Sequence, residues 1–306
     1  MDKVETNLLN EVLNHGSIEQ ADAYNIRANG HLQKRKENPY IHIRSKEDGS
    51  GIDIEVLPDT LFGIIDIPVI ITESGLTDIV YNDFYIGKNA NVTIVAGCGI
   101  HNHAEKQSQH NGIHRFFLEE NAKVRYIERH YAEGKGEGKK VLNPTTEISM
   151  KKGSYLMMDT IQLKGVDESI RITKANVEDG ATLVINEKIL TSNHQTATTD
   201  FQVTLGGGNA SCHVVSRSVA KDDSYQEFSS NIIGKDLCYG HVECDAIIQE
   251  NGRVKAIPEI DAQSVDANLI HEAAIGKIAG SQLMKLMSLG LSEKEAENAI
   301  ITGFLK

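Results

Sequence analysis

A short pattern recurs along the middle of this 306-residue chain and constrains its fold more than any other feature. Each copy begins with Gly or Asn, continues with a small residue, and then places apolar residues at alternate positions. The small residues are Ala90, Ala122, Ser154, Ala181 and Ala210, so successive copies lie 32, 32, 27 and 29 residues apart. Alternating apolar residues are typical of a β-strand with one buried face. Regular spacing in this range indicates a stacked, repeating architecture.

The segments between the copies decide what kind of stack this is. None of them has the apolar pattern of a crossover helix of about 10–15 residues, which argues against a sheet built from βαβ units. We therefore predict a mainly β fold, a β-helix (β-solenoid) whose turns lie ~4.7–4.9 Å apart, capped by short α-helices at both termini. A large antiparallel sandwich is the alternative, but it gives no reason for the regular spacing.

The N-terminal 50 residues do not follow the repeat. Residues 4–28 have apolar residues at helical spacing and are predicted to form two short helices, the second beginning at Ser17 with a capping box to Gln20. Residues 29–50 are polar and are expected to form a linker or an edge segment.

The helical pattern returns at the C-terminus. Helices are predicted over residues 271–289 and 293–305, with Gly290 ending the first and a capping box starting at Ser292. The expected organisation is a helical segment and linker (1–50), a β-helix core (51–269) and a helical segment (270–306).

Composition excludes several classes of partner. Lys and Arg number 31 against 43 Asp and Glu, giving a net charge of −12 that repels nucleic acid. The N-terminus lacks a signal-peptide pattern, and the most apolar run, residues 61–71, is shorter than the ~20 residues that span a bilayer. We expect a cytoplasmic protein with no membrane partner and with reduced cysteines. Phosphate-binding loops and common hydrolase motifs are absent from the sequence.

Cys98 opens a histidine-rich stretch of 17 residues, which also contains His101, His103, His110 and His114. Thiolate and imidazole both bind transition metals, so this stretch is a candidate metal site, and the alternative is a polar corner with surface histidines. Cys212 occupies an apolar slot of the repeat and is expected to be a core residue.

In a solenoid, a second set of candidate metal ligands would lie near Cys244. His271 and Glu272 follow it by 27 and 28 residues, within the range of the repeat spacings. Residues one turn apart lie side by side, so a thiol, an imidazole and a carboxylate could converge. The alternative places Cys244 in the core and His271 and Glu272 in the first turn of a helix.

The motifs around these residues resemble those of a known protein family. The segments HVECDAII, IPEID, HEAAIGKIAGSQL and GLSEKEAENAIITGF resemble the C-terminal core of the SufB/SufD family, scaffold proteins of SUF iron–sulfur cluster assembly. A weaker match around GCGIHNH extends the resemblance to roughly residues 80–306. The chain departs from the family at residues 128–130, Glu-Arg-His in place of Gln-Asn-Trp. The presence of both Cys98 and Cys244 is closer to SufB than to SufD.

The resemblance implies both a fold and a function. It implies a right-handed parallel β-helix and a SufC-like ABC-type ATPase that docks on the C-terminal helices. Cys244, Glu272 and His271 match the family's proposed site for a transient, nascent iron–sulfur cluster, and Cys98 matches a cysteine associated with sulfur acceptance. The chain would then be an assembly scaffold rather than an enzyme, served by a sulfur donor and by proteins that accept the cluster.

One chain offers too few ligands to complete a cluster, so we expect a homodimer that brings two sets together. The alternatives are a SufD-like supporting subunit without its own cluster and a carbohydrate-active β-helix enzyme. The second of these is disfavoured by the absence of Trp and the scarcity of other aromatic residues for sugar stacking.

Overall fold

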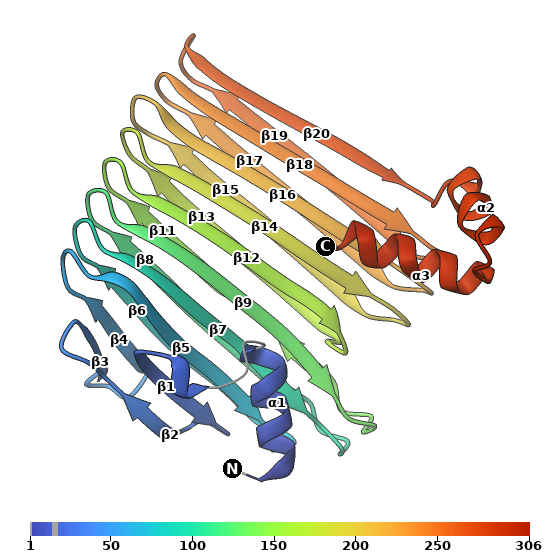
Figure 1. The fold of residues 1–306 in the computed structure, drawn as a ribbon, viewed down its shortest axis with the longest axis horizontal. Coiled ribbons are helices and arrows are strands. Elements are labelled where there is room, and N and C mark those ends of the chain that lie inside the picture. Colours follow the sequence, from blue (N-terminus) through green and yellow to red (C-terminus); the bar gives the residue numbers. More distant parts are fainter. Residues whose placement is uncertain (1, 14–17) are drawn as a thin grey trace.

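The structure is a computed structural model that describes residues 2–13 and 18–306, in which two long sheets face each other (Figure 1). Sheet A contains β1 (Ala23–Ala28), β2 (His31–Lys36), β5 (Leu61–Ile71), β7 (Asn91–His101), β9 (Lys123–Glu133), β12 (Tyr155–Lys164), β14 (Thr182–Thr191), β16 (Ala210–Ala220), β18 (Cys238–Ile248) and β20 (Ala267–Gly276). Sheet B contains β3 (Ile41–Ser45), β4 (Gly51–Val56), β6 (Thr77–Ile86), β8 (Ser108–Leu118), β10 (Lys140–Leu142), β11 (Thr145–Met150), β13 (Glu168–Val177), β15 (Thr196–Leu205), β17 (Tyr225–Gly234) and β19 (Arg253–Ala262). The helices are α1 (Lys3–Leu13), α2 (Gly280–Ser288) and α3 (Glu293–Phe304).

From β12 onward the chain alternates between the two sheets, and each strand pairs in parallel with the strand one turn away. This is a β-solenoid with helices at both ends of the chain, so the predicted fold class is confirmed and the antiparallel sandwich is not observed. Antiparallel pairing among the described strands occurs at the N-terminal end, between β1 and β2 and between β3 and β4.

The recurring sequence pattern has a direct structural cause. The residue before each small residue has a positive φ, between 58° and 68°, at Asn89, Asn121, Gly153, Gly180 and Asn209. Asn and Gly tolerate this conformation better than other residues, which explains why they recur there. The small residues that follow are all buried, because they point into the interior where the chain turns from sheet B into sheet A.

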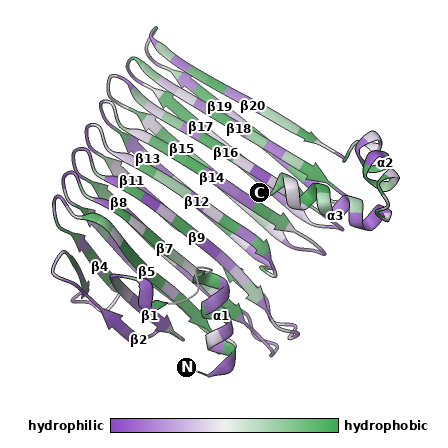
Figure 2. Ribbon diagram, viewed as in Figure 1, coloured by the Kyte–Doolittle hydropathy of each residue, from purple (hydrophilic) through white to green (hydrophobic). Residues whose placement is uncertain are grey.

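The second predicted N-terminal helix is wrong. Ile18–Gln20 form a single 3₁₀ turn, strand β1 follows, and Ser17 lies outside the described residues. Tyr24 and Ile26 lie on the same face of β1 and pack against α1. Their spacing of two residues is therefore that of a strand whose outer face is covered by a helix. Strands β2 and β3 occupy the segment expected to be a linker or an edge. Figure 2 shows β2 as predominantly hydrophilic, as suits an exposed edge.

The first C-terminal helix, α2, begins later than predicted, whereas α3 begins at Glu293 as predicted. Strand β20 continues to Gly276, so His271 and Glu272 lie on a strand and not in a helix. Gly290 ends the first helical segment with a φ of 99°, and Ser292 forms the predicted capping box with Glu295. Helix α3 is anchored by Ile301 and Leu305, which pack in a cluster with Val219 of β16, whereas no residue of α2 is buried.

Candidate functional site

Cys244 lies on the interior face of β18, with only 1% of its surface exposed. Its register partners are Ser216 on β16 and Ala273 on β20. Burial raises the pKa of the Cys244 thiol to about 12, and the negative charges of Glu187 and Asp245 act in the same direction. The thiol is therefore protonated at neutral pH, and it must gain access to solvent or a cation before it can act as a thiolate ligand.

His271 shares the interior face with Cys244. It pairs in register with Val242, two residues before Cys244, which places the Cα atoms of Cys244 and His271 about 8 Å apart on adjacent strands. Its Nδ1 lies 3.3 Å from the hydroxyl of Ser230 on the opposite sheet, and its Nε2 is buried without a hydrogen-bond partner. Burial lowers the pKa of His271, so a neutral imidazole with an unused nitrogen faces the interior.

Glu272 lies on the other face of the same strand. Its side chain is 66% exposed, and its Oε2 is 3.5 Å from Nε2 of His241 on β18. The structure thus brings Cys244 and His271 to one face but does not bring Glu272 to them within a single chain. The reason is the register, since Cys244 pairs with a residue 29 positions later, and neighbouring residues of a strand point to opposite faces.

A band of buried polar side chains runs along the interior from the position of Cys244. Ser216 donates to Glu187 at 2.7 Å, and Thr199 donates to the other oxygen of Glu187 at 2.9 Å. The Nε of Arg171 lies 3.6 Å from Glu187, and its Nη1 forms an ion pair with Glu128 on β9. Buried charges need such partners, because an isolated one is strongly disfavoured in a protein interior.

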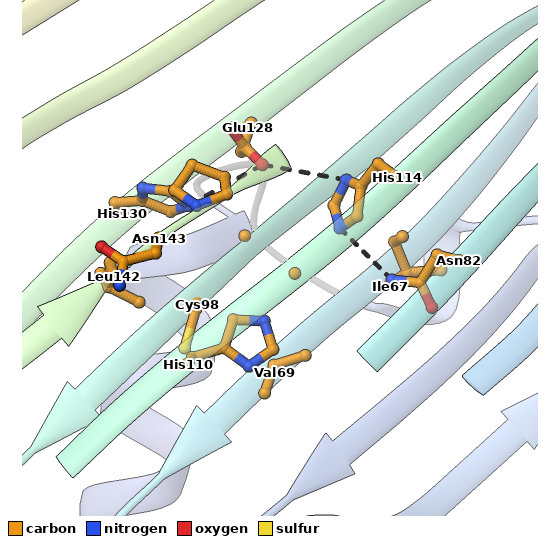
Figure 3. Close-up of a pocket in the computed structure, with 13 residues that line it drawn as sticks. Ile67, Val69, Asn82, Cys98, His110, His114, Glu128, His130, Leu142 and Asn143 are labelled. Carbon is orange, nitrogen blue, oxygen red and sulfur yellow. Dashed lines mark hydrogen bonds and ion pairs between the residues drawn. The ribbon is translucent and has the colours of Figure 1, made fainter. Parts of the chain in front are cut away.

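The band ends in a cluster of histidines around Cys98. The cluster lines a cavity of ≈ 10 Å³, which is space for about one water molecule. Its lining includes Cys98, His110, His114, Glu128 and His130 (Figure 3). Burial lowers the pKa of both His114 and His130 to about 4, so both are neutral at pH 7. Burial opposes the ionised form of Glu128, but Arg171 and the two histidines outweigh it and leave the pKa of Glu128 lowered.

Cys98 itself is fully buried on the interior face of β7, in register with His130. Burial raises the pKa of its thiol well above the ordinary value. His101, three residues later on the same strand, lies on the outer face and pairs with Glu133, so Cys98 and His101 do not share a site. His110 does face the interior, where its Nδ1 lies 3.0 Å from Asp78.

The remaining cysteines are Cys212 and Cys238. Cys212 is a buried core residue, as the repeat predicts, and burial raises the pKa of its thiol to about 12. Cys238 is also buried, and all four cysteines are free thiols.

The sequence interpretation missed two members of the interior cluster, Glu128 and His130, whereas His114 belongs to the predicted histidine-rich stretch. The signal was present, because Glu128 and His130 continue the alternate positions of Val124 and Tyr126 in one repeat. A polar residue in an interior slot of a strand is expensive to bury and is therefore worth attention.

The cluster and the Cys244 region are not complete metal sites. Within residues 2–13 and 18–306, no group of three or more His, Cys, Asp or Glu side chains is arranged to hold a metal ion. None of the described helices is long and apolar enough to cross a membrane.

Comparison with known proteins agrees with the resemblance drawn from the motifs. The family model described as "SUF system FeS cluster assembly, SufBD core domain" matches residues 71–304. An iron–sulfur cluster assembly SufBD family protein of Archaeoglobus fulgidus is 28% identical over 279 residues, which cover 90% of this chain and 73% of the relative. A SufBD family protein of Pyrococcus horikoshii is 28% identical over 273 residues, covering 87% of this chain and 82% of the relative. With the family model matching most of its length, the chain belongs to the SufBD family of SUF-system iron–sulfur cluster assembly proteins.

Proposed function

We propose that this chain is a scaffold on which a SUF-type machine builds a nascent iron–sulfur cluster, with Cys244, His271 and Glu272 as ligands. The observation that carries the proposal is that Cys244 and the unpartnered Nε2 of His271 face the same interior on the last two strands of sheet A. Thiolate and imidazole both bind iron. A mixed ligand set holds a cluster less tightly than four thiolates, which suits transfer to another protein.

The second set of ligands would come from a second copy of the chain. Strands β19 and β20 end the two sheets, and each has a neighbouring strand on one side. Apolar residues near this end are exposed, with Ile260 45%, Ile270 38% and Ile275 39% accessible. An unpaired edge with exposed apolar side chains favours association, and a two-fold dimer there would bring two Cys244–His271 pairs together.

A movement of β20 would be needed to involve Glu272, because this carboxylate lies on the outer face. Helix α2 follows β20 after three residues, so a partner that moves the C-terminal helices would also move His271 and Glu272. A SufC-like ATPase docked on these helices could supply that movement from ATP. The same movement would admit solvent to Cys244, whose thiol is otherwise held protonated by burial.

Cys98 is proposed to accept sulfur before it reaches the cluster. Cys98 and Cys244 face the same interior, five strand steps apart, or about 24 Å at 4.8 Å per step. The buried thiol of Cys98 lies beside neutral histidines that could take its proton when it reacts.

Anaerobic reconstitution with iron and sulfide tests the cluster site. We expect the wild-type protein to develop the visible absorption of an iron–sulfur cluster, and Cys244→Ser to lose most of it. His271→Ala and Glu272→Ala should each reduce the iron and sulfide retained per chain. Cys212→Ser is the matched control, because it changes a buried cysteine of the same pKa outside the site.

The outcomes separate the competing roles. Full cluster formation by Cys244→Ser would refute the proposed site. A wild-type protein that stays colourless and free of iron, while still binding the ATPase, would favour the SufD-like supporting role. Circular dichroism of each variant shows whether a loss reflects the site or the fold.

The C-terminal helices offer a sharper test of the ATPase partner than a truncation. Met284 is 67% exposed and Met287 41%, whereas removal of residues 291–306 would also strip Ile301 from its contacts with the core. We expect Met284→Ser with Met287→Ser to weaken ATPase binding at least tenfold in a pull-down or titration, because exposed apolar helix faces dock into grooves. Leu32→Ser, at an exposed site on β2, should bind as wild type. Unchanged affinity in the double variant would exclude α2 as the docking helix.

A further inference from the structure

The outer surface at the end of β7 carries a histidine pair that the cluster site does not use. His101 is the last residue of β7, and His103 follows in the turn towards β8. Their Nε2 atoms are in direct contact, with ring centroids 3.9 Å apart and ring planes nearly perpendicular at 88°. Each of the two imidazoles therefore directs its own Nε2 atom to the same point on the surface.

A carboxylate fixes the orientation of the first histidine. Oε1 of Glu133 lies 3.0 Å from Nδ1 of His101, and the two residues are register partners on β9 and β7. Because an ionised carboxylate only accepts hydrogen bonds, Nδ1 of His101 carries the proton. The Nε2 of a neutral His101 then carries a lone pair that is directed at Nε2 of His103.

Further contacts hold this carboxylate and the turn in place. Tyr131 donates its hydroxyl hydrogen to Glu133 at 2.9 Å, and Lys164 donates to the Tyr131 oxygen at 3.0 Å. The side chain of Asn102 is buried and spans the turn, donating to the carbonyl of Lys106 at 2.7 Å and accepting from the amide of Ala104 at 3.0 Å. The turn that presents His103 is thus fixed on both sides of that residue.

We propose that His101 and His103 form a binding site for a divalent transition-metal ion on the outside of the solenoid, with Glu133 orienting His101. Imidazole nitrogen is a preferred ligand of Zn²⁺, Ni²⁺, Cu²⁺ and Fe²⁺. A histidine that binds a metal usually donates its other ring N–H to a carboxylate, which is the arrangement of His101 and Glu133.

Metal binding requires a small movement of one imidazole ring and leaves the ion accessible to solvent. Two nitrogens at about 2.0–2.1 Å from one Zn²⁺ ion lie farther apart than they do in this pair, so one ring must move back. His103 is exposed and can make that movement, whereas His101 is only 13% exposed and is held by Glu133. The remaining coordination positions face solvent, so water or a ligand from another molecule would complete the shell and the ion could exchange.

The site is separate from the proposed cluster site. Cys98 points to the interior and His101 to the outside, and Cys244 lies several strands away in sheet A. Metal binding at His101 and His103 therefore does not rest on the scaffold function, and the two can be tested independently.

Calorimetric titration of the untagged full chain with Ni²⁺, repeated with Zn²⁺, tests the proposal. We expect one ion per chain at this site, and at least a tenfold loss of affinity in His103→Ala. Glu133→Gln should weaken binding by about 10- to 100-fold, because it replaces the carboxylate that accepts the Nδ1–H of the ligand His101. His194→Ala, which removes an exposed histidine from another turn, should bind as the wild type does.

A structural readout accompanies the affinities. On addition of Zn²⁺, the Nε2 resonances of His101 and His103 should both shift in nitrogen-detected histidine spectra, while that of His194 should not. Binding by His103→Ala within twofold of wild type, or a wild-type chain that takes up no ion, would overturn the proposal. His103 is exposed, so its replacement tests the site without disturbing the core.

Discussion

Arg171→Met is expected to destabilise the protein by about 3–5 kcal/mol, the usual cost of removing one partner from a buried ion pair. Arg171 is 4% exposed and lies between two buried carboxylates, those of Glu128 and Glu187. Without the guanidinium, two carboxyl groups would remain in the interior with no opposite charge beside them. Urea unfolding, followed by circular dichroism, measures the loss.

Two controls separate the buried charge from the change of side chain. Lys174→Met makes a similar replacement on the exposed face of the same strand, and should change stability by less than about 0.5 kcal/mol. Adding Glu128→Gln and Glu187→Gln to Arg171→Met should recover much of the lost stability, because the uncompensated charges are then gone. If Arg171→Met unfolds at the same urea concentration as Lys174→Met, the buried triad does not stabilise the fold.

The repeat made the solenoid predictable because each copy forms the same turn and therefore has the same local sequence requirements. A turn with positive φ requires Asn or Gly, and the next residue must be small to point inward at the corner. These requirements are local, so they can be recognised from the residue types at Asn89, Asn121 and Gly153 without knowing the partner strands. The Ser292 capping box was predictable for the same reason.

The faces of the candidate ligands were not predictable from spacing alone. The repeats differ in length by several residues, so a separation of 27 or 28 did not fix the register. Because side chains alternate, a shift of one residue exchanges the faces of a strand. The observed offset of 29 places His271 on the face of Cys244 and Glu272 on the other.

The N-terminal strand was misassigned for a different reason. The apolar residues of β1 contact both the interior and α1, so its sequence lacks the clear alternation of a strand with one exposed face. Apolar residues on both faces of a short segment fit a helix and a strand equally well. Tertiary packing, not local propensity, selects the strand at Tyr24 and Ile26.

The protein should lose several kcal/mol of stability as the pH falls from about 6.5 to 4, through the buried histidines near Cys98. Burial lowers the pKa of His114 and of His130 from 6.5 to about 4. Below pH 6.5 the unfolded chain binds protons that the folded chain does not, so protonation favours unfolding. Each histidine then contributes a slope of up to about 1.4 kcal/mol per pH unit within that window.

Other buried groups modify this pH dependence in known directions. The lowered pKa values of Glu128 and Asp78 make their contributions fall away in more acidic solution, below the ordinary carboxyl range. Burial raises the pKa of Glu187, so its contribution opposes theirs. The loss between pH 6.5 and about 5 should therefore come mainly from the histidines.

Urea midpoints measured between pH 8 and pH 5 test this assignment. His130→Gln keeps a polar side chain in the cluster but removes one titrating group, so the fall in stability over this range should be about half that of the wild type. His194→Gln, at an exposed position, should leave the wild-type profile unchanged. A wild-type stability that stays flat from pH 6.5 to 5 would mean that the interior already accommodates the imidazolium forms. In that case protons could enter the Cys98 cavity without unfolding the solenoid, and the protonated histidines would no longer be available as bases for the thiol in that range.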